Sequence, residues 1–261
     1  MAVEISAIKV EASAHALLER YGIRRPGFSV EDVARAENIK IERGVLRNVD
    51  AWLVRTKDGG GKIRIRDDIV ELGRLRFSVG HELGHWEMHP NLSQGFLCTT
   101  ADFTDYAKSV HEAEANLFAA NFLMPRQWIR ADAWKGDPSM EMVSDLAREF
   151  GTTLTAAARR FAELSGRGVA IVFSSSGRVQ WSVKSMRAKT VFIANGSGIP
   201  EHSLTRECLE KNKSPLGPEE IDLNTWLPTW NVGKDTELFE DVRISQKYGW
   251  AITLLWIPEL G

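Results

Sequence analysis

The sequence predicts an α+β protein with a helix-rich first part and a smaller, strand-rich C-terminal part. Apolar residues recur at helical spacing in the first part, above all between residues 72 and 125. After the stretch Leu164–Gly168, the apolar runs become short and are separated by turn residues, as in β-hairpins. The chain has 261 residues and is 43% hydrophobic, which suffices for one large or two modest cores. We therefore expect domains at residues 1–165 and 166–261.

Two helices are expected near the N-terminus. Residues 7–20 read as a helix that ends at Gly22. A second helix follows Ser29 and runs to about Asn38. Ser29 is a typical N-cap because its hydroxyl can accept a hydrogen bond from the backbone N–H three residues later, here that of Asp32.

A hairpin is expected next. Residues 51–55 and 62–66 flank the turn sequence Asp58–Gly61, so we expect the two segments to pair. In residues 62–66 isoleucines alternate with basic residues, which is typical of a half-buried edge strand.

A histidine motif follows the hairpin. Residues 77–85 read Phe-Ser-Val-Gly-His-Glu-Leu-Gly-His, so His81 and His85 lie one above the other on one helical face. This is the HExxH pattern of zinc hydrolases, in which both imidazoles reach one metal ion and the glutamate, here Glu82, lies beside it. The opposite face is apolar and is expected to pack into the core. It consists of Leu75, Val79, Leu83 and Trp86. Pro90 should end the helix, because proline cannot continue the hydrogen-bond ladder.

A third metal ligand is expected on the next helix. The extended pattern HExxHxxGxxH is excluded, since Met88 and Asn91 stand where it requires glycine and histidine. Residues 109–125 read as a buried helix, in which a carboxylate is costly unless it is paired or binds metal. We assign Glu112 as the third ligand and Asn116, one turn later, as the acceptor that orients a ligand histidine. Glu114 points elsewhere on the helix and is expected to be a solvated or capping carboxylate.

The two helices resemble a known family. His-Glu-Leu-Gly-His, followed by Glu-x-Glu-Ala-Asn-x-Phe-Ala-Ala-x-Phe-Leu-Met-Pro, is similar to the block of the ImmA/IrrE metallopeptidases, most strongly over residues 72–125. The resemblance implies a zincin-like domain with a gluzincin-like site, in which His81, His85 and Glu112 bind the metal and Glu82 is the general base. It also implies cleavage of helix-turn-helix repressors, which releases stress-response or mobile-element genes. Thermolysin-like sites usually carry aspartate where Asn116 stands.

The expected chemistry is metal-assisted hydrolysis. Two neutral imidazoles and one carboxylate leave a zinc ion, or alternatively a manganese ion, with net positive charge for polarising water and a carbonyl. Glu82 would accept the water proton and pass it to the departing amide. Residues 62–66 would suit a strand that aligns an extended substrate, or a strand that only covers the core. Donors to the oxyanion could be Tyr106, His89, His111 or Arg159, each of which also has a plainer structural role.

Residues 139–165 resemble a helix-turn-helix, with Gly151 at the turn. A DNA-reading helix should present several donors to base edges, but this one begins Thr155-Ala156-Ala157-Ala158. We therefore favour a core-packing hairpin over DNA binding.

The last part of the chain is expected to contain two further hairpins. One pairs residues 169–173 with 179–183, and the other pairs 238–245 with 250–257. Five tryptophans lie in this part, most of them expected in the core: Trp181, Trp226, Trp230, Trp250 and Trp256. The family resemblance associates such a region with sensing or substrate recognition.

Composition excludes several classes of protein. No apolar run reaches the length of a membrane span, and the N-terminus lacks the basic region of a secretory signal. Cys98 and Cys208 are the two cysteines and lack metal-like spacing, so a reducing cytoplasm is the simplest location. The net charge of -2 gives no general attraction to nucleic acid.

Three functions remain open on the sequence alone. The chain is a cytoplasmic zinc endopeptidase that cuts a repressor, a DNA-binding regulator with a structural metal site, or a silent scaffold that grips a repressor. Glu82 favours the peptidase, because a structural site has no need of a carboxylate beside an open coordination position.

Overall fold

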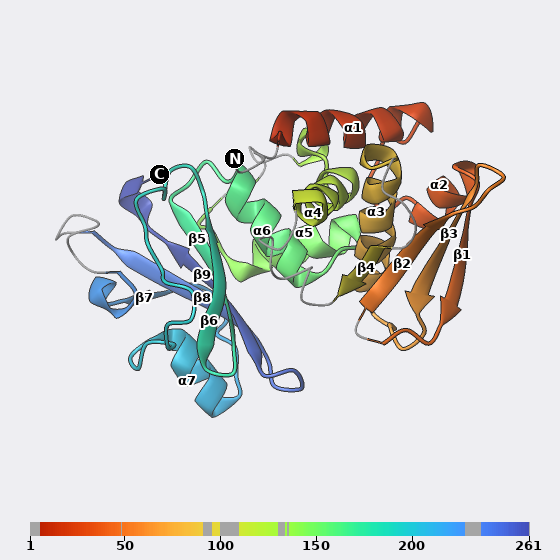
Figure 1. Ribbon diagram of the computed structural model, residues 1–261. Helices are drawn as coiled ribbons and strands as arrows, with labels where there is room; N and C mark the ends of the chain where they lie inside the picture. The colour runs from red at the N-terminus through yellow and green to blue at the C-terminus, as the bar shows by residue number, and fades with distance from the viewer. Residues whose placement is uncertain are drawn as a thin grey trace. The chain divides into compact units, whose positions relative to one another are not determined.

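The computed structural model describes residues 6–47, 49–90, 96–99, 110–129, 134, 136–227 and 236–260 (Figure 1). These residues form seven α-helices and two β-sheets, which confirms the predicted α+β class. The chain packs as two compact units, residues 1–129 with 149–153 and residues 130–148 with 154–261. The domain division at residue 165 stays a prediction. No helix in the described part of the chain is long and apolar enough to span a membrane.

The first unit contains both predicted N-terminal helices, the predicted hairpin and the two long helices of the motif region. Ser29 accepts a hydrogen bond from the Asp32 backbone N–H at 3.0 Å, as predicted, although this helix ends at Ala36, before the expected Asn38. The helices are α1 (Ala7–Arg20), α2 (Val30–Ala36), α3 (Leu72–Met88) and α4 (Val110–Leu123), followed by the 3-10 turn η1 (Arg126–Trp128). The strands are β1 (Ile39–Gly44), β2 (Val49–Arg55), β3 (Gly61–Arg66) and β4 (Phe96–Thr99).

β3 lies in the interior of a four-stranded sheet of order β1-β3-β2-β4. It pairs antiparallel with β2, as the hairpin prediction requires, and parallel with β1 on its other side. The prediction that residues 62–66 form an edge strand is therefore wrong. The alternation itself is confirmed, since Ile63 and Ile65 are buried whereas Arg64 is exposed. Because both edges of β3 are occupied, this strand cannot align a substrate, and the outer strands of the described sheet are β1 and β4.

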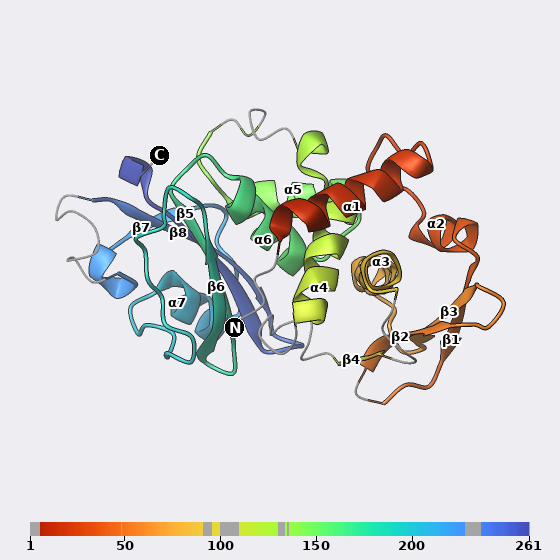
Figure 2. The same ribbon diagram turned by 45° about the horizontal axis from the view of Figure 1, so that its top comes forward.

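α3 is the central helix of the first unit. Figure 2 shows it nearly end-on, with α1, α2, α4 and the sheet arranged around it. Val79 and Leu83 are fully buried, as the apolar stripe predicts, but the histidine face is buried as well. All residues from Ser78 to His85 are buried, so the motif lies inside the unit. The helix ends at Met88, before Pro90.

The second unit is built on a five-stranded antiparallel sheet of order β6-β5-β9-β8-β7. Both predicted hairpins are confirmed, β5 with β6 and β8 with β9. The strands are β5 (Val169–Ser175), β6 (Arg178–Lys184), β7 (Glu219–Ile221), β8 (Leu238–Ser245) and β9 (Trp250–Trp256). The other elements are α5 (Met140–Phe150), α6 (Leu154–Leu164), α7 (Leu204–Lys211), η3 (Leu223–Thr225) and η5 (Pro258–Leu260). Of the five tryptophans, the buried ones are Trp181, Trp226 and Trp256. Trp250 is partly buried, and Trp230 lies outside the described residues.

The predicted helical hairpin is formed by α5 and α6. Gly151 makes the turn with a φ of 60°, a conformation that costs glycine little. Most apolar side chains of the two helices are buried, although Met142 and Leu154 are only partly so, which fits a core-packing hairpin. The buried ones are Met140, Val143, Leu146, Phe150, Ala157, Ala158, Phe161 and Ala162.

Two neighbouring acidic residues on β8 anchor helices of the second unit. Successive side chains of a strand point to opposite faces. Glu240 accepts hydrogen bonds from the backbone N–H groups of Leu204 and Thr205 at 2.9 and 2.8 Å, at the start of α7. Asp241 accepts one from Met140 at 2.7 Å, at the start of α5. The positive end of each helix therefore meets a buried carboxylate. Burial nevertheless raises the pKa of both acids.

Candidate metal centre

Close contact between α3 and α4 positions the predicted ligands. A Cβ atom added at Gly84 would lie 3.1 Å from the Ala115 Cα and 3.1 Å from the Phe118 Cβ. One turn earlier, a Cβ at Gly80 would lie 3.5 Å from the Ala119 Cβ. The small residues of both helices thus allow the backbones to approach. This approach brings the histidine face of α3 against the first turns of α4.

The structure brings His81, His85 and Glu112 together. The two Nε2 atoms are 3.0 Å apart, His81 Nε2 is 3.2 Å from Glu112 Oε2, and His85 Nε2 is 3.2 Å from Glu112 Oε1. All three side chains are buried. Ligand atoms 2.0–2.1 Å from a tetrahedral zinc ion are separated by about 3.3 Å. The donor set and its spacing therefore fit a metal ion, and the group could hold one.

Asn116 is hydrogen-bonded to His81. Its Oδ1 lies 3.0 Å from His81 Nδ1, one helical turn after Glu112 on α4. A carbonyl oxygen only accepts hydrogen bonds, so His81 Nδ1 carries the proton and donates it. His81 Nε2, which faces Glu112, is then the nitrogen whose lone pair a metal ion would take in place of a proton. This is the form of histidine that binds metal.

The electrostatics of the group favour an ionised Glu112. Burial alone would raise the pKa of Glu112, but hydrogen bonds from His81 and His85 hold it well below its usual range. Burial lowers the pKa of His85 to about 4, so this imidazole is neutral near neutral pH. Burial also disfavours protonated His81, but Glu112 and the nearby charge of Glu82 outweigh it and raise the pKa of His81. A divalent cation requires the ionised carboxylate together with neutral imidazoles, so its binding would release any proton held at His81 Nε2.

Glu82 lies on α3 directly after His81 and is fully buried. The possible donors to the oxyanion named from the sequence are His89, His111, Arg159 and Tyr106. His111 is exposed, and its ring centroid lies 4.7 Å from that of His89. The Arg159 guanidinium lies 3.5 Å from the centroid of the Trp181 ring in the second unit. Tyr106 lies outside the described residues.

His89 and Glu114 join the group, which the sequence did not predict. His85 Nδ1 lies 3.0 Å from His89 Nδ1, and His89 Nε2 lies 3.0 Å from Glu114 Oε2. The expectation of a solvated or capping Glu114 is therefore wrong, since 18% of its side chain is exposed and it pairs with His89. The sequence does indicate that His89 could join the group, because His81, His85 and His89 repeat at intervals of four residues on one helical face.

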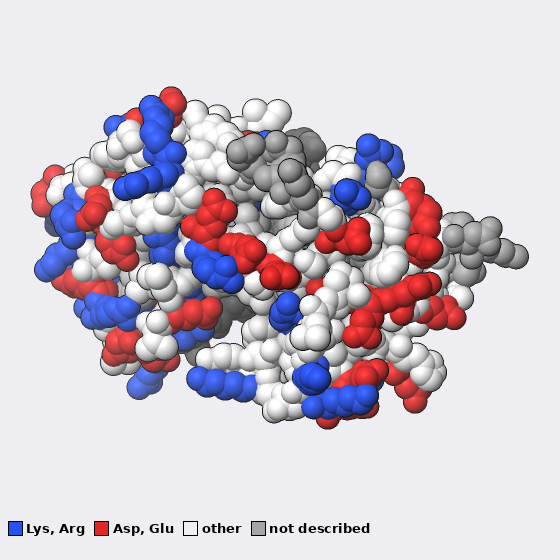
Figure 3. Space-filling model, turned by 180° about the vertical axis from the view of Figure 1, so that it is seen from behind, with Lys and Arg blue, Asp and Glu red and all other residues white. Residues whose placement is uncertain are grey.

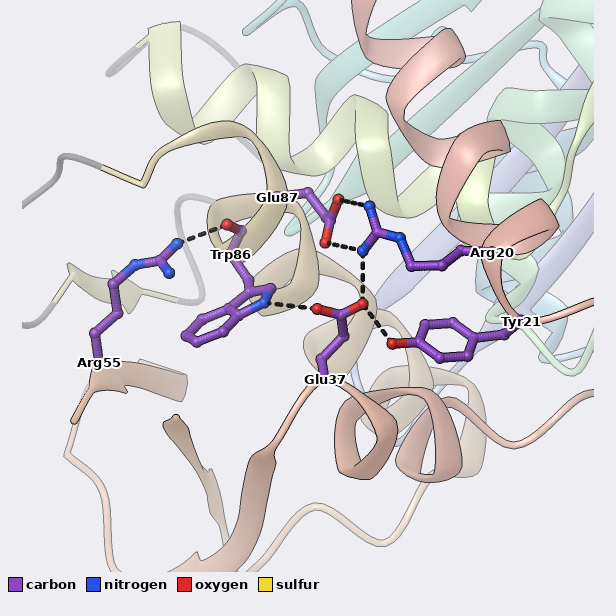
Figure 4. Close-up of polar contacts among 6 residues, drawn as sticks. All are labelled: Arg20, Tyr21, Glu37, Arg55, Trp86 and Glu87. Carbon is purple, nitrogen blue, oxygen red and sulfur yellow. Dashed lines mark hydrogen bonds and ion pairs between the residues drawn. The ribbon is translucent and has the colours of Figure 1, made fainter. Parts of the chain in front are cut away.

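A polar network holds the last turn of α3 (Figure 4). Arg20, at the end of α1, donates two hydrogen bonds to Glu87 at 2.9 and 3.0 Å. Arg20 and the Tyr21 hydroxyl each donate to Glu37 Oε1 at 2.6 Å. The Trp86 indole N–H donates to the other oxygen of Glu37 at 3.2 Å. α1 and the C-cap of α2 therefore hold the turn that follows His85.

β2 holds the same turn. Arg55 donates a hydrogen bond to the Trp86 carbonyl at 2.6 Å, and its guanidinium carbon lies 4.0 Å from the centroid of the indole ring (Figure 4). A cation over an indole face is attracted by the ring electrons. The end of α3 is thus fixed from three elements.

Comparisons with known proteins place α3 and α4 within a family domain. The family model of the IrrE N-terminal-like domain, Peptidase_M78, matches residues 34–162, which include α3 and α4. No curated protein matches the chain. A solved structure described as a Mycobacterium tuberculosis transcriptional regulator is similar with a TM-score of 0.60 at 13% identity, over 95% of this chain and 76% of that chain. At this identity the likeness shows the fold alone. Through the matched domain, the chain belongs to the ImmA/IrrE family of metallopeptidases, as the resemblance of residues 72–125 predicts.

Proposed function

We propose that the chain is a metal-dependent endopeptidase with a zincin-like site. The observation that carries this proposal is the convergence of His81, His85 and Glu112, with separations of 3.0–3.2 Å inside a buried helix pair. Membership of a peptidase family supports it. Zinc is the simplest cation for two imidazoles and one carboxylate, and manganese is the alternative.

In this proposal each residue has a separate task. A bound divalent cation would supply polarisation of a water molecule and of the scissile carbonyl. His81 and His85 present their Nε2 lone pairs, Glu112 supplies the negative charge, and Asn116 orients His81. Glu82 accepts the proton of the attacking water and passes it to the departing amide nitrogen.

The proposed substrate is a helix-turn-helix repressor in the cytoplasm, whose loss would derepress stress-response or mobile-element genes. The family resemblance supports this substrate, and the similar solved chain is itself described as a transcriptional regulator. An extended segment of the substrate could pair with an outer strand of the first sheet, β1 or β4, as peptides do with exposed sheet edges. Residues 166–261 would serve recognition or sensing.

Direct DNA binding is the less supported function. Most apolar side chains of α5 and α6 are buried, which fits a structural hairpin. On the face shown in Figure 3, lysine and arginine side chains are interspersed with aspartate and glutamate, without one basic band. A DNA-binding face usually gathers positive charge.

Cleavage of a purified repressor tests the proposal directly. Helix-turn-helix repressors from the same genome are each incubated with the full-length protein alone, with added chelator, and with chelator followed by excess zinc or manganese. The fragments are identified by mass spectrometry. We expect one or a few cuts that the chelator abolishes and a metal restores. His81→Ala and Glu112→Ala should lose both bound metal and cleavage, whereas the exposed His202→Ala control should lose neither. Cleavage without metal, or none by metal-loaded protein, would contradict the proposal, and the latter result would favour the silent scaffold.

A further inference from the structure

A chain of hydrogen bonds runs outward from His85. It joins His85 Nδ1 to His89 Nδ1 and His89 Nε2 to Glu114 Oε2, each at 3.0 Å. His89 is 7% exposed, and its backbone N–H donates to the His85 carbonyl at 3.1 Å, so its ring is held at the end of α3. Glu114 comes from α4, the same helix that supplies Glu112.

The chain has one consistent direction if His85 binds a metal through Nε2. His85 Nδ1 must then carry the ring proton and donate it, which makes His89 Nδ1 the acceptor. A neutral imidazole that accepts at Nδ1 carries its proton at Nε2, and that proton faces the Glu114 carboxylate. Every polar atom along the chain therefore has the partner that its tautomer requires.

His81 and His85 differ in the hydrogen-bond partner of their Nδ1 atoms. His81 donates to Asn116, which is a neutral amide. The chain behind His85 ends in a carboxylate, and a carboxylate behind a ligand histidine raises its basicity and fixes its orientation. Asn116 brings no negative charge to His81, whereas the Glu114 carboxylate brings one to His85 through His89.

We propose that His89 and Glu114 are positioning residues that orient and polarise His85 for the metal. This inference rests on the proposed function, because it requires that His81, His85 and Glu112 bind a divalent cation. The ring of His111, 4.7 Å from that of His89 between centroids, lies beside the chain and carries no part of the proposal.

Metal affinity is the direct readout. Zinc affinity is measured by competition with a chromophoric chelator, and the absorption spectrum of the cobalt-substituted protein reports the geometry around the metal. His89→Ala should weaken affinity on the order of 10- to 100-fold and change the cobalt spectrum, with one metal still bound at saturation. The metal-free variant should melt close to metal-free wild type, which a purely structural role for His89 would not allow.

Conservative variants separate the effect of the hydrogen-bond acceptor at residue 89 from the effect of the negative charge of Glu114. His89→Asn offers an amide oxygen to His85 at the place of His89 Nδ1 and should restore part of the affinity lost in His89→Ala. Glu114→Gln keeps an acceptor for His89 but removes the charge, so it should weaken affinity by less than His89→Ala. Adding Glu114→Gln to His89→Ala should change nothing further, because Glu114 acts only through His89. The exposed Glu141→Gln is the matched control.

The outcomes distinguish the two proposals. Failure of wild-type protein to bind metal would overturn the proposed function itself. If the wild type binds metal but His89→Ala binds it with unchanged affinity, the positioning role alone is overturned. The same holds if the losses of affinity in the two single variants add in the double variant.

Discussion

His81 and His85 have equivalent places in the motif, but the structure surrounds their outer nitrogens differently. Helical spacing could predict that His81 and His85 share one helical face and that Glu112 and Asn116 share another, because i, i+4 relations are local. The cost of a buried carboxylate and the family resemblance predicted that the two pairs meet. Helical spacing could not predict the contact of His89 with Glu114. Those two residues belong to different helices, and their distance depends on how α3 crosses α4.

At the same scale, Glu82→Gln separates metal binding from proton transfer. The amide has nearly the shape of the carboxylate, so we expect the fold and the metal content to stay near wild type. It cannot accept a proton, so cleavage should fall on the order of a hundredfold or more. Metal analysis and the rate of repressor cleavage, measured on one preparation, check both parts. Wild-type cleavage by Glu82→Gln would remove Glu82 as the general base.

Among the elements, β3 shows where sequence pattern is insufficient. Alternating isoleucines and basic residues indicate one buried and one solvated face, but they do not say how many neighbours a strand has. β1 pairs with β3 in parallel, and a carboxylate oxygen of Glu42 on β1 lies 3.3 Å from the Nζ atom of Lys62 on β3. The basic face of β3 is thus partly matched by an acidic residue on the strand that the hairpin prediction omits.

The crossing of α3 and α4 makes Gly84→Ala informative. Its new Cβ would lie 3.1 Å from the Cα of Ala115 and 3.2 Å from the Ala115 carbonyl oxygen, which are backbone atoms that cannot move alone. We expect a loss of about 1–3 kcal/mol of stability and weaker metal binding, because α4 carries Glu112. Gly80→Ala is the matched control, since its Cβ would make contacts of 3.5 Å or more. There the higher helix propensity of alanine should leave stability equal or greater. Denaturant titrations of metal-free protein compare them, and equal effects would contradict this packing argument.

The network at the end of α3 predicts an alkaline loss of stability. Burial and the hydrogen bond to Glu37 raise the pKa of Tyr21 from 10.0 to about 12 in the folded protein. Between these values the unfolded chain loses the Tyr21 proton first, so Tyr21 stabilises the fold fully below pH 10 and loses that contribution as the pH rises to 12. The stability difference between wild type and Tyr21→Phe should therefore shrink over this range. A difference independent of pH would show that the hydroxyl does not hold its proton through Glu37.

On the scale of the whole molecule, the site and the second sheet belong to different compact units. The first unit holds every residue assigned to the metal, whereas the second has its own apolar core on β5, β8 and β9. The sequence predicted a change from a helix-rich part to a strand-rich part near residue 165. It could not predict that α5, up to Arg148, would pack with the second unit, because its helical spacing is the same in either core.

Removal of the metal should therefore act locally. A cation that binds only the folded site stabilises it by mass action, by about 2.7 kcal/mol at one hundred times its dissociation constant. We expect a chelator to increase hydrogen exchange in α3 and α4 and to leave β5 and β9 nearly unchanged. Mass spectrometry of peptides from both units measures this, and Glu112→Ala, which should hold no metal, should respond to the chelator in neither unit. Equal loss of protection in α3 and β9 of wild type would show instead that the two units unfold as one, and the site would then report on the stability of the entire chain.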